Sequence, residues 1–324
     1  MNDQSSHVLT KLLFSLAVVA GAAWLVFNRQ AVIDFYRLQT YQAPAAVAQL
    51  AANDKLTSKG HDLFYESQPE IQNSAAFNQS CSAHEQTIVL GCYSVQRIYL
   101  YNVTDTRFDG VKEVTAAHEM LHAAYERLSD ADRQHVNAML KPIIEGMKDQ
   151  RILDLITLYN KEEPGELYNE MHSILGTEYA NLTPDLENYY KQYFQDRSVV
   201  VGYADKYQAI FTESKAKLDQ YDAQLNAMKP QIDQNNATLK QMQSELQAQS
   251  DQLSRYRNQG QIQQYNQLVP SYNDKVVEFN ALIDQTKSLV NQYNALVQER
   301  NQQAAAQNNL YNNLDSNYQT VQQQ

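Results

Sequence analysis

The last 120 residues of the chain restrict its fold most strongly, because their apolar residues recur at every third or fourth position over many turns. This spacing is typical of helices that pack in coiled coils. It pauses at Asn258-Gln259-Gly260 and then resumes, which predicts two long helices in an antiparallel hairpin. Pro230 and Pro270 are expected to interrupt or kink them. The periodic positions are Leu218, Tyr221, Leu225, Met228, Ile232, Leu239, Met242, Leu246 and Leu253, then Ile262, Tyr265, Leu268, Val276, Phe279, Ile283, Val290, Tyr293 and Val297.

The sequence does not decide the role of residues 205–324. A helical hairpin can serve as a stalk, as a partner-binding arm or for self-association. About a third of its residues are Gln or Asn, a composition that is also compatible with a partly disordered or association-prone tail. We expect the coiled-coil hairpin and keep these roles as alternatives.

The start of the chain carries sixteen residues without a charge, Leu12–Phe27, flanked by Lys11 and Arg29. As a helix this run would be about 24 Å long, slightly shorter than the roughly 30 Å hydrocarbon core of a bilayer. A cleaved signal peptide is the alternative, because Ala20-Gly21-Ala22 resembles a cleavage site, although the apolar run continues beyond it. We therefore predict one uncleaved N-terminal transmembrane helix within residues 1–30.

The only two cysteines, Cys81 and Cys92, indicate the compartment of the rest of the chain. Their spacing suits one small loop closed by a disulfide, and disulfides persist in oxidising compartments. Two unrelated thiols are the alternative. The charges that flank the apolar run do not decide its orientation. The cysteines thus favour a chain whose bulk lies outside the cytoplasm.

Residues 31–204 contain the pattern that carries chemistry, His118-Glu119-Met120-Leu121-His122. Residues four apart lie on one face of a helix, so the imidazoles of His118 and His122 can approach one metal ion. Two imidazoles and a carboxylate suit Zn²⁺ and leave a position open for water. Glu119, on the flank of that face, can take a proton from the water. Such a pattern also occurs by chance, but an apolar stripe beside the histidines favours a packed helix: Val114, Ala117, Leu121, Ala124 and Leu128.

Two segments before this helix read as strands, 87–93 and 97–103, because they are rich in β-branched and aromatic residues. Asp109 is expected to cap the histidine-bearing helix. Ser129 and Thr183 are expected to cap two later helices. The middle segment is therefore predicted to be mostly helical with a small β-sheet.

The segment Val114-Thr-Ala-Ala-His-Glu-Met-Leu-His-Ala-Ala-Tyr125 resembles the active-site helix of zinc metallopeptidases of the gluzincin type. In that group the third ligand is a Glu on a later helix, often after an Asn, and Asn169-Glu170-Met171-His172-Ser173 is similar to that signature. The resemblance implies a zincin-like fold with His118, His122 and Glu170 as zinc ligands. The Gly-x-Met-x-Asn substrate signature of the aminopeptidases is absent, so removal of N-terminal residues is not implied.

Other residues compete for roles at this site. Glu178 is the main rival for the third ligand, since eight helical residues turn it by only about 80° from Glu170, and Glu166 is a weaker one. His172 could bond a developing oxyanion or orient a ligand, although a lone helical His is more often a structural partner. Tyr99 or Tyr101 could also reach a reaction intermediate. His61 and His84 lack partner spacing and are expected to be structural.

We therefore expect an α+β chain: a transmembrane helix (1–30), a mostly helical zincin-like domain with a small β-sheet (31–204) and a coiled-coil hairpin (205–324). The expected function is that of a membrane-anchored, extracytoplasmic zinc metallopeptidase that hydrolyses peptide or protein substrates with Glu119 as general base. The alternative is a surface interaction or scaffold protein in which the hairpin binds a partner and the zinc site is structural or degenerate.

Composition narrows these functions further. The charge of 26 − 37 = −11 makes the chain a poor binder of nucleic acid. Two cysteines are too few for a Cys-rich zinc module or an iron–sulfur cluster.

Overall fold

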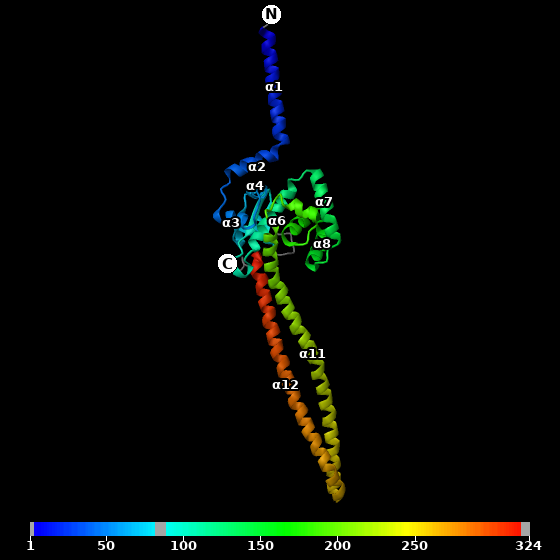
Figure 1. The fold of residues 1–324 in the computed structure, drawn as a ribbon. Helices are drawn as coiled ribbons and strands as arrows, with labels where there is room; N and C mark the ends of the chain where they lie inside the picture. Colours follow the sequence, from blue (N-terminus) through cyan, green and yellow to red (C-terminus); the bar gives the residue numbers. More distant parts are fainter. Residues whose placement is uncertain (1–2, 82–88, 319–324) are drawn as a thin grey trace. The chain divides into compact units, whose positions relative to one another are not determined.

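The computed structural model describes residues 3–81 and 89–318 and divides into two compact units. The first comprises Met1–Ala209 and Asn312–Gln324, and the second Ile210–Tyr311. The chain is mostly helical with one small sheet (Figure 1), which confirms the α+β class.

The sheet has three strands in the order β1-β3-β2: β1 (Glu70–Gln72), β2 (Gly91–Ser94) and β3 (Arg97–Tyr101). β1 runs parallel to β3, whereas β2 is antiparallel to it and pairs Cys92 with Tyr99. β2 and β3 lie in the two segments predicted as strands, of which residues 87 and 88 are outside the described part. Sequence reasoning missed β1, because a strand of three residues is too short to show alternation.

Helices α5 (Ser74–Ser80) and α6 (Val111–Glu126) pack on this sheet. The other described helices of the first unit that follow α1 (Asp3–Phe27) are α2 (Arg29–Thr40), α3 (Ala45–Asn53), α4 (Ser58–Glu66), α7 (Asp130–Glu145), α8 (Gln150–Glu162), α9 (Leu167–Glu178) and α10 (Pro184–Tyr190). Helix α6 is central, and its apolar stripe packs against α9 through Leu121 and Leu175, both fully buried. Gly176 lies in the same contact, since a β-carbon there would stand 2.4 Å from Leu121 Cδ1.

Two of the three predicted helix caps are confirmed. The Ser129 hydroxyl accepts from the Asp132 N–H at 3.2 Å at the start of α7, and the Thr183 hydroxyl accepts from the Leu186 N–H at 3.4 Å at the start of α10. The prediction for α6 is wrong. Its N-cap is Gly110, with φ of 100°, a left-handed conformation that glycine adopts without steric cost. Asp109 instead ends the short 3₁₀ turn Thr106–Phe108.

The N-terminal residues form helix α1 (Asp3–Phe27), which meets α2 at an angle of 74°. No single helix among the described side chains meets the length and hydropathy expected of a membrane span, although Phe14–Phe27 and Arg29–Thr40 do so as a bent pair. The side chains of residues 1–13, and with them the start of the predicted anchor, lie outside the described part.

The predicted disulfide between Cys81 and Cys92 is confirmed, with 6.0 Å between the two Cα atoms. Cys81 caps the C-terminus of α5, and Cys92 lies in β2. The bond therefore ties the end of a helix to an edge strand of the sheet.

The second unit is built from most of α11 (Arg197–Asn258) and α12 (Ile262–Leu314), with Gly260 at φ of 71° in the break between them. Asp222 pairs with Arg300 at 3.0 Å and Ser214 with Gln303 at 3.1 Å, which confirms an antiparallel hairpin. Both helices run without a break through Pro230 and Pro270, so the expected interruption is wrong. A proline removes one backbone hydrogen bond, and the many helical residues on either side maintain the helix.

We expect Gly176→Val to lower the free energy of unfolding by about 1–3 kcal/mol, because the added atoms overpack the contact between α6 and α9. Chemical unfolding followed by circular dichroism measures this change. The matched control is Gly202→Val, whose β-carbon has no neighbour within 4 Å and which should change stability by less than about 0.5 kcal/mol. Equal stability of the two variants would contradict the close packing.

Candidate metal centre

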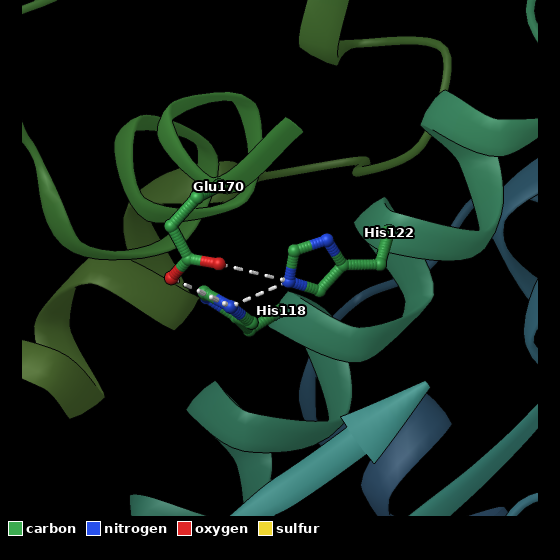
Figure 2. Close-up of side chains that lie close together, drawn as sticks. All are labelled: His118, His122 and Glu170. Atoms are coloured by element: carbon green, nitrogen blue, oxygen red, sulfur yellow. Dashed lines mark hydrogen bonds and ion pairs between the residues drawn. The ribbon is translucent and has the colours of Figure 1, made fainter. Parts of the chain in front are cut away.

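Three side chains that the sequence singled out converge in the first unit (Figure 2). His118 and His122 project from α6 one turn apart, and their Nε2 atoms are 3.0 Å from each other. Glu170 reaches them from α9, with Oε1 3.5 Å from His118 Nε2 and Oε2 3.4 Å from His122 Nε2. The structure thus brings together two residues of one helix and a carboxylate that is 170 − 122 = 48 positions further along the chain.

These distances fit a single zinc ion. Nitrogen and oxygen ligands bind Zn²⁺ at 2.0–2.2 Å in a tetrahedron, so two ligand atoms of one ion are about 3.3 Å apart. The two imidazole nitrogens are 3.0 Å apart, each lies 3.4 or 3.5 Å from a different oxygen of Glu170, and one ligand atom from each residue lies within 4.8 Å of the others. Two imidazoles and a carboxylate also form a donor set that zinc accepts while one position stays open.

Neighbouring side chains orient two of the three groups. The Asn169 side-chain amide donates to Glu166 at 3.0 Å, so its oxygen accepts from His122 Nδ1 at 2.9 Å. This bond holds a ring proton of His122 on Nδ1, so Nε2, the atom that faces Glu170, is the nitrogen that can offer its lone pair to a metal once it gives up its proton. Tyr159 of α8 donates a hydrogen bond to Glu170. Sequence reasoning named Asn169 only as part of a motif, and among 22 tyrosines nothing distinguished Tyr159.

The charges at the centre follow from burial and from proximity. Burial opposes ionisation of Glu170, but the two imidazoles and Tyr159 together lower its pKa to about 2. Burial lowers the pKa of His118 to about 4 against the attraction of Glu170. Burial acts in the same direction on His122, yet its hydrogen bond to Glu170 raises the pKa to about 9. The centre therefore holds an ionised carboxylate, as a divalent cation requires.

Glu119 lies in the same cavity, which has a volume of about 450 Å³. Its side chain is buried, with 5% of the residue exposed, and strand β2 packs directly on it. A β-carbon at Gly91 would stand 2.9 Å from Glu119 Oε1 and 2.5 Å from Thr115 Cγ2. Gly91 therefore lets β2 approach the carboxylate, and residues 89–93 line one wall of the cavity.

The rival ligands have other partners. Glu178 also lines the cavity, but Arg151 Nη1 and Gln208 Nε2 each bond its carboxylate at 2.8 Å. Burial raises the pKa of Glu178 against the pull of Arg151. Glu166 is exposed at the N-cap of α9 and accepts from Asn169. The geometry therefore favours Glu170 as the third ligand.

The other sequence candidates are not among the residues that line the cavity. His172 is fully buried, bonds the Tyr189 hydroxyl at 3.0 Å and packs among tyrosine rings, and burial lowers its pKa to about 3. A structural role of this kind is the more common one for a lone histidine on a helix.

The two tyrosine candidates have other contacts. Tyr101 packs on Phe77 in the core, and Tyr99 lies under Arg97. The tyrosines of the cavity are instead Tyr93, Tyr159 and Tyr207. Of the two histidines that the sequence predicts to be structural, His61 stacks on Tyr65, and His84 lies outside the described residues.

Comparison with known proteins adds no assignment: the sequence matches no protein-family model, and no curated protein or solved structure shows significant similarity to it.

We expect Asn169→Ala to weaken zinc binding by about 10–100-fold, because the His122 ring loses the partner that sets its tautomer and orientation. Competition with a chromophoric chelator measures the affinity. Asn160→Ala is the matched control, since Asn160 is an exposed residue of α8 that bonds only the Ile156 carbonyl among the contacts described. An Asn169→Ala affinity equal to that of the control would contradict the orienting role.

Proposed function

We propose that this protein is a membrane-anchored, extracytoplasmic zinc-dependent peptidase of the gluzincin type. The observation that carries the proposal is the convergence of His118, His122 and Glu170 at zinc-ligand separations, with Glu119 in the same cavity. A lone sequence motif places only the two histidines together, whereas a carboxylate brought in from another helix completes a ligand set.

Each residue has a definite chemical task. His118, His122 and Glu170 would hold Zn²⁺, which supplies Lewis acidity and lowers the pKa of a bound water. Glu119 would take the proton from the attacking water and then deliver it to the leaving amine. Asn169 and Tyr159 would keep the ligands in position through their hydrogen bonds to His122 and Glu170.

A peptide substrate fits the wall of the cavity. Among the described residues β2 pairs with β3 alone, so its other edge has backbone groups that another strand can use. An extended peptide can add to such an edge through main-chain hydrogen bonds. Since β2 also packs on Glu119 through Gly91, a peptide bound there would pass the general base.

Two further features support the location and the activity. The disulfide between Cys81 and Cys92 agrees with an oxidising compartment outside the cytoplasm. A scaffold with a structural metal has no use for a buried acid beside the ligands, and Glu119 is such an acid. The interaction protein with a partner-binding hairpin is therefore the second reading.

We expect Glu119→Gln to keep about one zinc per chain but to lower peptide cleavage by about 10²–10⁴-fold, the range of general acid–base catalysis. Elemental analysis measures the metal, and a mixture of unfolded peptides with internally quenched fluorophores measures cleavage. A Glu119→Gln variant that cleaves peptides as fast as the parent protein would contradict the proposed mechanism.

We expect His118→Ala to lose both zinc and cleavage, because a ligand is removed from the centre. His61→Ala is the control, since His61 has a side chain that is 44% exposed and does not line the cavity. Addition of a chelator to the parent should abolish cleavage, and added Zn²⁺ should restore it. If the pure parent protein shows no chelator-sensitive cleavage, the interaction protein is the better reading.

A further inference from the structure

Helix α2 is attached to the protein through Gln30, Asp34 and Arg37, and it exposes an apolar group on another side. Asp34 on its inner side is buried and binds Arg127, with Oδ1 2.9 Å from Nη2 and Oδ2 3.1 Å from Nε. On the other side Phe35 and Tyr36 are 66% and 67% exposed, and Val32 is 39% exposed. We call Val32, Phe35 and Tyr36 the outer face of α2. Apolar side chains grouped on an exposed helix face favour a contact with a partner or a membrane.

The inner side of α2 is fixed by specific bonds, so the outward position of the aromatic residues is built into the fold. Arg37 donates to the Gln96 carbonyl at 2.9 Å, and the Gln96 side chain donates to Gln30 at 2.6 Å. Both bonds attach α2 to the turn between β2 and β3. A rotation of α2 that buried Phe35 and Tyr36 would break these bonds and the pair of Asp34 with Arg127.

The turn held by α2 carries a further exposed apolar residue. Val95 is 87% exposed and has φ of 51°, a conformation that is unfavourable for a β-branched residue. Asn and Gly are preferred in such turns because they adopt positive φ at less cost. Valine at this position therefore gains nothing from packing inside the protein and offers apolar area to a neighbour outside it.

Helix α1, which directly precedes α2 in the chain, indicates what contacts this apolar surface. Helix α1 contains the uncharged run that ends at Phe27, and α2 begins two residues later at 74° to it. If α1 follows the bilayer normal, α2 lies close to the plane of the membrane. Aromatic residues are enriched at that depth, where lipid headgroups meet acyl chains. The only acidic residue of α2, Asp34, is turned inward, so the outer face carries no charge that anionic lipids would repel.

We propose that the outer face of α2 lies in the interfacial layer of a lipid bilayer, as a second membrane contact beside the helix α1. This contact rests on the membrane anchor of the proposed function but not on the peptidase activity. A protein partner or a second copy of the chain is the competing occupant, and the continuity with α1 favours the lipid.

The contact would also orient the metal centre. Arg127, which binds Asp34 of α2, donates to the Tyr93 hydroxyl at 3.0 Å, and Tyr93 lines the cavity. With α2 lying along the bilayer, the cavity keeps one orientation toward the membrane. Substrates would then be peptide segments at a defined distance from the lipid, a consequence that rests on the proposed function.

The test uses the full chain reconstituted in phosphatidylcholine vesicles. Both native cysteines are in the disulfide, so Tyr36→Cys introduces one thiol that a fluorophore can label. Lipids that carry a nitroxide near the headgroup should quench this label several-fold more strongly than a label at Lys141→Cys, an exposed position of α7. Trp24, the only tryptophan, reports on α1 in the same samples. Circular dichroism verifies that both variants fold.

Quenching of the Tyr36→Cys label together with Trp24 is the expected result. The proposal would be overturned if Trp24 is quenched but the Tyr36→Cys label is quenched no more than the Lys141→Cys label. It would also be overturned if neither Trp24 nor the Tyr36→Cys label is quenched. Shielding of the Tyr36→Cys label in lipid-free detergent as protein concentration rises would also overturn it, because a second copy would then be the occupant. No outcome depends on zinc or on cleavage.

Discussion

The close packing of α6 against α9 is the constraint on which the candidate centre depends. The two histidines of α6 share a face because of helical periodicity alone, whereas the third donor must come from another helix. Gly176 permits this approach, since a larger residue would strike Leu121 and Tyr190. The distance between the helices thus determines whether Glu170 reaches the imidazoles, and ordinary core packing determines that distance.

The wall of the cavity is held from several directions at once. Strand β2 is joined to α5 by the disulfide of Cys92, approaches Glu119 through Gly91, and is bonded through Tyr93 to Arg127 at the end of α6. A strand at the edge of a sheet carries backbone N–H and C=O groups that another chain can pair with. Among the described residues, these attachments hold β2 beside the buried Glu119 while β2 pairs with β3 alone, an arrangement that suits the peptidase we propose.

The orientation of helix α2 is set by an ion pair between Asp34 and Arg127. The Arg127 pair with Asp34 takes two charges partly out of water, a cost that mutual attraction and further hydrogen bonds offset. Such a pair contributes more to geometry than to net stability. It fixes which side of α2 faces the protein and leaves Phe35 and Tyr36 outward. The membrane-facing surface that we propose is therefore a consequence of a polar contact on the opposite side of the helix.

Local features of this protein were determined by its sequence alone, because they depend on residues close together in the chain. They include the shared face of His118 and His122, the hairpin break near Gly260, and the caps at Ser129 and Thr183. Choices among distant residues required the tertiary structure. The sequence offered three acids as the third ligand, and only packing shows that Arg151 and Gln208 engage Glu178 while Glu170 meets the imidazoles. The short strand β1 and the outward position of Phe35 and Tyr36 on α2 were likewise beyond sequence patterns, since contacts far along the chain decide them.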